Sequence, residues 1–109
     1  MDAVFKALAD ASRRELLDRL RADNGLTLNH LCERLGKSGA TMTRQAVSKH
    51  LAVLEDANLV ATVKRGREKL HYLNPAPIHE IHQRWIDKYE RGRVRALGDL
   101  KRRLEDENE

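Results

Sequence analysis

Hydrophobic residues recur at three- and four-residue intervals over most of the chain, and this spacing predicts a mostly helical protein. A first helix is expected over residues 2–9. A second should begin at Ser12, whose hydroxyl can form a capping box with Glu15. It should end near Asn24 and Gly25, a favourable helix stop. The apolar side of these N-terminal helices, residues 1–24, carries Val4, Phe5, Leu8, Leu16, Leu17 and Leu20.

Two further helices are expected within residues 27–58, as a helix-turn-helix. Thr27 can cap the first of them, and the glycine-containing loop GKSGATM, residues 36–42, follows it. Thr43 can cap the second helix, and Asn58 suits the left-handed backbone conformation that often ends one. The second helix places Val47, Leu51 and Leu54 on one stripe and turns a polar set away from it: Arg44, Gln45, Ser48 and Lys49.

The pattern then changes to a β-hairpin over residues 60–73, in which two short strands flank the turn RGRE. Four basic residues gather near its tip: Lys64, Arg65, Arg67 and Lys69.

Residues 76–106 form a long helical pattern after Pro75, with Gly92 and Gly98 as its expected weak points. Its apolar positions are Ile78, Ile81, Trp85, Tyr89, Leu97, Leu100 and Leu104. A helix of roughly 30 residues is about 45 Å long, and the small remaining body is too short to cover such a stripe. We therefore expect it to pair with another chain.

Length and composition limit the protein to one small domain, since the chain has 109 residues and is 40% hydrophobic. It has a single cysteine and no apolar run of the length of a membrane span, so we expect a reduced, soluble, cytoplasmic protein. The net charge is +4, and residues 43–73 hold six Lys and Arg against three Asp and Glu. A basic bias in this segment fits a partner that carries phosphate.

Helix, loop, helix and basic hairpin together define a winged helix-turn-helix, which is mostly α with a small β-hairpin. An α-helix fits the major groove of double-stranded DNA, and hairpin arginines can reach phosphates or the minor groove. The alternative is a module that binds protein and whose basic hairpin is merely solvated. The helix pair alone would also suit an ordinary helical hairpin with a polar outer side.

The stretches FKALADASRRELLDRL, TRQAVSKHLAVLEDANLV and RGREKLHYLNP resemble the opening helices, the recognition helix and the wing of the ArsR-type winged-helix transcriptional repressors. The final helix, with RWIDKYER at residues 84–91, looks closest to a subgroup that does not sense metals. The resemblance implies a homodimeric repressor that reads a palindromic operator. It places these residues at the DNA: Thr43, Arg44, Gln45, Ser48, Lys49, His50, Arg65 and Arg67.

The same resemblance implies that the first and last helices form the dimer interface. The residues expected there are Phe5, Ile81, Trp85, Tyr89, Leu97 and Leu100. Trp85 and Tyr89 could instead line an effector pocket, although such a stripe is more often interface or core. One departure from the family is the loop at residues 36–42, which is several residues longer than a tight turn and makes individual base contacts harder to assign.

Metal sensing on the same scaffold is the main alternative function. Cys32 and His30 are two positions apart, which does not place them side by side on a helix. His79 and His82 could share a metal across a dimer, but the further ligands that such a site needs are missing downstream. We therefore expect no cofactor and no metal, and the effector, if one exists, is not predicted. The sequence contains no motif for a nucleophile or a phosphate loop, so we expect no enzyme.

Overall fold

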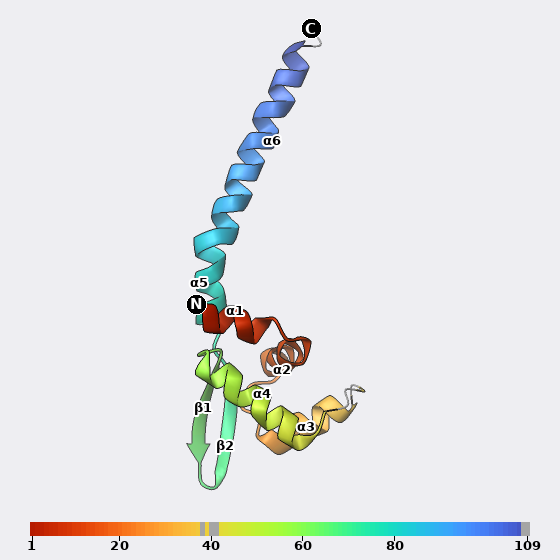
Figure 1. Cartoon of the computed structure of the whole chain (residues 1–109), viewed down its shortest axis with the longest axis vertical. Helices are drawn as coiled ribbons and strands as arrows, with labels where there is room; N and C mark the ends of the chain where they lie inside the picture. Colours follow the sequence, from red (N-terminus) through yellow and green to blue (C-terminus); the bar gives the residue numbers. More distant parts are fainter. Residues whose placement is uncertain (38, 40–41, 108–109) are drawn as a thin grey trace. The chain divides into compact units, whose positions relative to one another are not determined.

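The computed structural model describes residues 1–37, 39 and 42–107, and it confirms a mostly helical chain with one two-stranded antiparallel hairpin (Figure 1). In chain order the elements are α1 (Asp2–Leu8), α2 (Ala11–Ala22), α3 (Leu28–Lys37), α4 (Arg44–Asp56), β1 (Val60–Arg65), β2 (Glu68–Leu73), α5 (Ala76–Ile81), the π-helical segment η1 (His82–Ile86) and α6 (Asp87–Glu107). The chain forms two compact units, residues 1–77 and the residues from 78 onward. Within the described residues no helix is long and apolar enough to cross a bilayer.

The core of the first unit lies among α2, α3 and α4. Its largest fully buried side chains are Leu16, Leu20, Leu31, Leu35, Val47, Leu54, Leu59 and Val60. These are the positions that the helical spacing predicts for α2 and α4, and Leu51 of α4 is buried as well. Burial of these leucines supplies the main driving force for folding, about 1.5–3 kcal/mol for each side chain removed from water.

The start of α2 differs from the expected capping box. Asp10 is the N-cap, and its Oδ1 accepts hydrogen bonds from the amides of Ser12 at 2.8 Å and Arg13 at 3.2 Å. The prediction that Ser12 caps this helix is wrong, because the helix already begins at Ala11 and Ser12 lies in its first turn. The Asp10 carboxylate takes the cap position two residues upstream of Ser12, where it accepts charge-assisted hydrogen bonds from two amides of the first turn.

The predicted caps at Thr27 and Thr43 and the predicted helix end at Asn58 are confirmed. The Thr27 hydroxyl accepts from the amide of His30, and the Thr43 hydroxyl accepts from the amide of Ala46 at 3.1 Å. Asn58 follows α4 with φ 63°, in the left-handed region. The expected loop over 36–42 starts later than predicted, because Gly36 still belongs to α3. Residues 38, 40 and 41 of that loop lie outside the described part of the chain.

The hairpin pairs Val60 with Leu73 at its base and Arg65 with Glu68 at its tip. Gly66 has φ 64° in the two-residue turn between them, at the position that a type II′ turn gives to glycine. The base is held to the helices through Leu26, which forms an isolated bridge with His71 of β2.

The second unit is built from the C-terminal helical segments. The predicted continuous helix is interrupted by the π-helical segment His82–Ile86, whereas Gly92 and Gly98 lie inside the regular helix α6. The weak point is therefore a change of helix type and not either glycine. None of the residues of α6 is buried.

Asp10→Ala should destabilise the protein at neutral pH, because two amides at the start of α2 lose their acceptor. The hydrogen bond from the Arg13 amide lowers the pKa of the Asp10 carboxyl in the folded chain, with the Ser12 amide adding to the effect. The contribution of Asp10 is thus fully present above about pH 4 and is lost as the pH falls through the folded pKa. Denaturant unfolding of wild type and variant between about pH 7 and about pH 2 should show a difference that closes in acid. The matched variant Ser12→Ala should change stability little at any pH, and a loss equal to that of Asp10→Ala would restore Ser12 as the cap.

Candidate nucleic-acid interface

Helix α4 presents a polar, solvent-exposed side opposite its buried stripe. Arg44, Gln45, Ser48 and Lys49 are all exposed, while Val47 between them is 1% exposed. The cause is the helical period, which turns residues at i, i+1 and i+4 away from the core while i+3 faces it. Four hydrogen-bonding side chains of the kind that contact base edges and phosphates therefore lie together on one helix.

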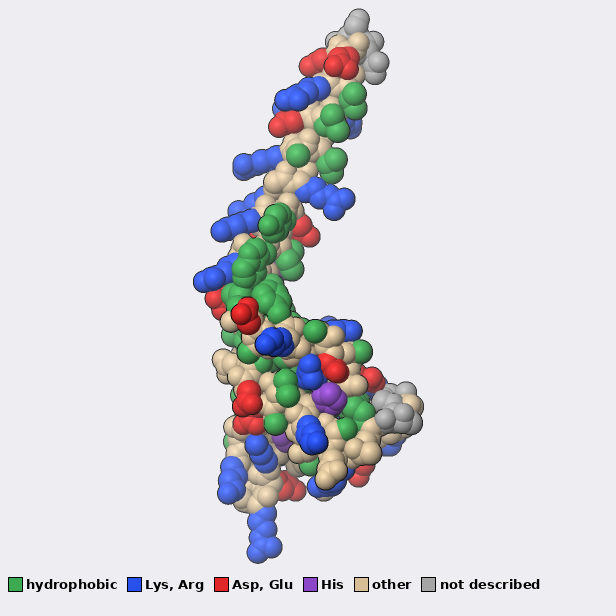
Figure 2. All heavy atoms as spheres, viewed as in Figure 1, with side chains coloured by type: hydrophobic (Ala, Val, Ile, Leu, Met, Phe, Trp, Pro, Cys, Tyr) green, Lys and Arg blue, Asp and Glu red, His purple; other side chains and the backbone are tan. Residues whose placement is uncertain are grey.

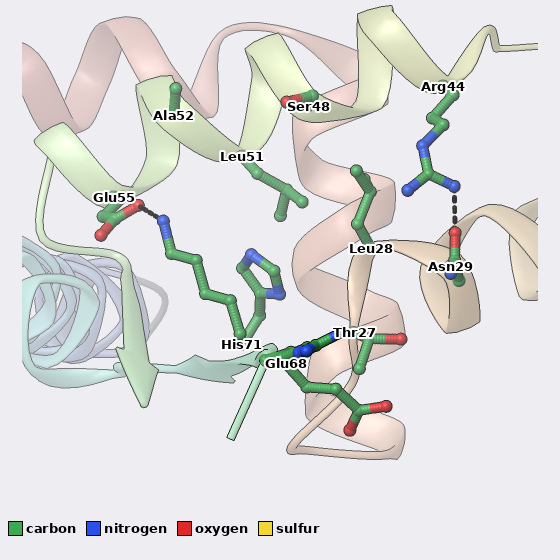
Figure 3. Close-up of a pocket in the computed structure, with 12 residues that line it drawn as sticks. Thr27, Leu28, Asn29, Arg44, Ser48, Leu51, Ala52, Glu55, Glu68 and His71 are labelled. Carbon is green, nitrogen blue, oxygen red and sulfur yellow. Dashed lines mark hydrogen bonds and ion pairs between the residues drawn. The ribbon is translucent and has the colours of Figure 1, made fainter. Parts of the chain in front are cut away.

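Arg44 and Ser48 face a hollow between α4, the start of α3 and the hairpin (Figure 3). The hollow has a volume of about 360 Å³, and Thr27, Asn29 and Arg67 also line it. The Arg44 guanidinium donates to the Asn29 side-chain oxygen, and this hydrogen bond holds the arginine toward the N-terminal end of α3. The structure thus brings Arg44 and Ser48 together with Arg67 of the hairpin, as a helix and wing acting on one DNA duplex require.

The tip of the hairpin is strongly basic. Lys64, Arg65 and Arg67 are exposed, and basic side chains project from the hairpin in Figure 2. Glu68 stands directly opposite Arg65 across the two strands, so that its carboxylate partly offsets the arginine. Within the turn, Arg67 follows Gly66 and is one of the hairpin residues that line the hollow beside α4.

Glu55, near the C-terminal end of α4, connects the helix to both strands of the hairpin. Its Oε2 lies 3.2 Å from the Lys69 Nζ of β2, and its Oε1 accepts a hydrogen bond of 3.1 Å from the Thr62 hydroxyl of β1. The hydrogen bond from Lys69 is the largest of the effects that hold the pKa of the Glu55 carboxyl below its ordinary value, and Thr62 adds to it. Glu55 therefore stays ionised at neutral pH.

Sequence reasoning missed Glu55 altogether and treated Lys69 only as one of the basic residues at the tip. The two residues are 14 positions apart and lie on different elements. No local pattern joins them, because their contact depends on how the hairpin folds back over α4. The nearest signal in the sequence is the position of Glu55 itself, one helical turn after Leu51 on the side that faces the hollow.

His50 differs from the other residues expected at the DNA. It is half-buried, and its Nδ1 lies 3.4 Å from the Nη1 of Arg13 on α2. Arg13 also donates to the carbonyl oxygens of Ala7 at 2.8 Å and Lys6 at 2.9 Å, at the end of α1. This nitrogen of His50 therefore takes part in packing α4 against the N-terminal helices and is not turned toward the exposed side with Gln45.

His71 is the one polar side chain among the described residues that is buried in the core, and it is 5% exposed. It projects from β2 toward Leu51 (Figure 3), and its Nδ1 donates to the carbonyl oxygen of Leu26 at 2.9 Å. The backbone of the same two residues is also paired, with the His71 amide 2.8 Å from the Leu26 oxygen. His71 thus fixes the base of the hairpin against the segment that precedes α3.

The residues expected at a dimer interface are apolar and largely exposed, and they divide between the two units. In α6, Tyr89 is 73% exposed, Leu97 56% and Leu100 51%. Leu104, which belongs to the predicted apolar stripe, is as exposed as Leu100, and Val94, which the prediction did not include, is more exposed than these leucines. In the first unit Phe5 is exposed on α1. Trp85 is exposed and Ile81 half-buried, both near the π-helical segment.

The histidines and the cysteine do not come together in the part of the chain that the structure describes. Those residues contain no group of three or more His, Cys, Asp or Glu side chains placed to hold a metal ion. His82 Nδ1 lies 3.6 Å from the Asp87 carboxylate, at the join between the π-helical segment and α6. Cys32 is half-buried in α3.

Comparison with known proteins agrees with this geometry. Residues 8–63 match a sequence family described as a helix-turn-helix domain. The HTH-type transcriptional regulator YuzN of Bacillus subtilis is 45% identical over 87 residues, which cover 79% of this chain and 95% of the relative. The structure of an ArsR-like transcriptional regulator from Rhodococcus sp. RHA1 is 30% identical and superposes with a TM-score of 0.73, covering 96% of this chain and 90% of that one.

A third similar protein is AntR, an antimony-specific transcriptional repressor. Its structure is 28% identical and has a TM-score of 0.56, covering 80% of this chain and 77% of its own. The chain belongs to the ArsR-type family of helix-turn-helix transcriptional regulators. It is a transcriptional regulator with a helix-turn-helix DNA-binding domain, and it is not an enzyme.

Proposed function

We propose that this regulator is a repressor that binds, as a homodimer, an operator made of two related half-sites. One observation carries the proposal: Arg44 and Ser48 of α4 line the same hollow as Arg67 of the hairpin. A recognition helix in the major groove and a wing on the adjacent backbone need this side-by-side arrangement. The similarity to AntR, which is a transcriptional repressor, supports repression as the direction of control.

Within this interface the roles divide by side-chain chemistry. Gln45, exposed in the first turn of α4, can form paired hydrogen bonds with a base edge, whereas Lys49 and Ser48 can serve base or phosphate. Arg65 and Arg67 of the wing are cations at the end of a hairpin and are suited to phosphate or to a narrow minor groove. Thr43 keeps its hydroxyl for the cap of α4, so it contributes to the interface mainly by fixing where the helix begins.

The second copy of the chain is proposed to cover the apolar stripe of α6. Leu97, Leu100 and Leu104 are spaced by three and four residues, the spacing of a helix seam that pairs with another helix. Most of the stability of a helix in a protein comes from packing of its apolar side, and α6 has no buried residue of its own in one chain. Two-fold pairing through this stripe gives two recognition helices and hence two half-sites.

An electrophoretic shift with DNA from upstream of the chain's own gene tests the proposal as a whole. A shift that resists competition by scrambled DNA is expected. Equal binding of both DNAs would contradict sequence-specific recognition, and binding of neither would favour the alternative of a winged-helix module that binds protein. Transcription from that upstream DNA in vitro should fall as the protein is added.

Gln45→Ala and Arg67→Ala should have different effects on DNA. Gln45→Ala should cost about 1–3 kcal/mol on the operator and relax preference at one position in each half-site. Arg67→Ala should weaken operator and scrambled DNA alike and reduce the slope of log K against log salt by about one per chain. Fluorescence anisotropy with both DNAs at several salt concentrations measures these quantities.

Arg21→Ala, which removes the same charge from an exposed position of α2, serves as the matched control and should leave the slope unchanged. The assignment of roles is reversed if Gln45→Ala weakens both DNAs equally while Arg67→Ala alters sequence preference.

Leu97→Glu combined with Leu100→Glu should convert a dimer into a monomer at micromolar concentration. Two leucines lose about 1.5–3 kcal/mol of burial each, so the dissociation constant should rise by about 100-fold or more. Sedimentation velocity measures the change. Arg95→Glu lies on the opposite side of α6 and should leave the dimer intact. A well-folded wild-type protein that sediments as a monomer would contradict this part of the proposal.

A second candidate is a metal-responsive repressor, supported by the similarity to the antimony-specific AntR. The chain contains one cysteine, whereas soft metals and metalloids are usually held by several thiolates. We expect that zinc, cobalt, nickel and antimonite leave the affinity of the protein for its operator unchanged. Titrating each into the protein–DNA complex measures this, and a tenfold loss of affinity that a chelator reverses would establish the metal-responsive function instead.

A further inference from the structure

The wing places two lysines opposite each other, and a carboxylate from α4 binds one of them. In the hairpin register Lys64 of β1 stands directly opposite Lys69 of β2, and directly opposed cations destabilise a strand pair. Strand alternation places both side chains, with Thr62, on the same face of the hairpin. Glu55 of α4 reaches this face and binds Lys69 and Thr62, one residue from each strand.

The ion pair between Glu55 and Lys69 fixes the position of the lysine side chain, although both residues are too exposed for the pair to add much to the stability of the protein. The side chains of Glu55 and Lys69 are 38% and 55% exposed, and an ion pair of this kind contributes little to overall stability. It does decide where the Lys69 ammonium lies. The ammonium is drawn toward α4, next to the hollow that Arg44 and Arg67 also line, and it is neutralised there.

We propose that Glu55 is a positioning residue for DNA recognition, which restrains Lys69 so that the wing offers phosphate contacts only through the other cations of its tip. The inference rests on the proposed function, since it concerns the same DNA interface. Without the carboxylate, Lys69 is an unpaired cation on a flexible stem at the edge of that interface. It then adds a phosphate contact that carries no base information, and affinity for all DNA rises more than affinity for the operator.

Glu55→Gln tests this restraint, because the amide keeps the size of the side chain and can still accept from Thr62 but has no charge to hold Lys69. The salt slope of binding to scrambled duplex should steepen by about 0.9 per chain. Affinity for scrambled duplex should therefore fall about 3.5-fold more per chain than in wild type between about 50 mM and about 200 mM salt. The ratio of operator to scrambled affinity at low salt should decrease. The operator is the duplex recovered by selection with wild-type protein from a random pool.

Three further variants separate this restraint from a general change of charge. Asp56→Asn removes the same charge from the exposed residue next to Glu55 on α4 and should leave the slope close to that of wild type. Lys69→Met alone should also leave the slope unchanged, because the restrained ammonium makes no phosphate contact. The double variant with Glu55→Gln and Lys69→Met should return to the wild-type slope.

The outcomes are distinguishable. If the wild-type protein selects no preferred duplex, the proposed function is contradicted, and this result does not depend on the role of Glu55. If wild type does select an operator, the inference is overturned by an unchanged slope in Glu55→Gln or by an equal increase in Asp56→Asn. It is equally overturned by an increase that persists in the double variant. If thermal unfolding shows that Glu55→Gln does not fold, Lys69→Met is the remaining test. An unchanged salt slope in Lys69→Met supports the inference. A slope reduced by about 0.9 overturns it, because it would show that Lys69 already contacts phosphate in the wild type.

Discussion

Burial of one side of α4 is the constraint on which the rest of the first unit depends. Val47, Leu51 and Leu54 are between 0% and 4% exposed, and they lock the rotation of the helix about its axis. Replacing any of them with alanine would leave a cavity that typically costs about 2–5 kcal/mol for a leucine. With that rotation fixed, the polar side of the helix has only one direction in which to point. The same packing that stabilises the protein therefore aims its recognition surface.

The position of the wing depends on α4, because the first strand of the hairpin follows this helix after a short turn. Asn58 turns the chain in a left-handed conformation directly after α4, and Leu59 is fully buried, so the first strand must begin close to the core. The second strand is tied down by the paired backbone and side chain of His71 with Leu26. Only the distal part of the hairpin is left to be placed by polar contacts, and there Glu55 is the residue that spans from helix to strands.

The features that the sequence predicts correctly are those with a local physical cause. Helical and strand periods follow from which side is buried, and the Thr43 cap and the Asn58 helix end depend only on their immediate neighbours. The cap of α2 was misassigned because Asp10 and Ser12 both suit the role, and the choice depends on where the first turn starts. Long-range contacts such as Arg13 with His50 have no period, so they were not predicted. The assignments of DNA-contacting and interface residues stay predictions.

The distribution of charge gives a reason why restraint of a single lysine matters in a regulator of this family. Residues 43–73 carry an excess of only three positive charges, and each phosphate contact contributes to operator and competing DNA alike. One additional cation per chain is therefore a large fraction of the non-specific attraction. A genome offers vastly more competing sites than operators. Adding a cation strengthens binding to operator and competing DNA alike, whereas holding a cation away from phosphate weakens mainly the binding to competing DNA. A carboxylate such as Glu55 at the edge of a basic surface therefore raises the preference for the operator at the cost of total affinity for DNA.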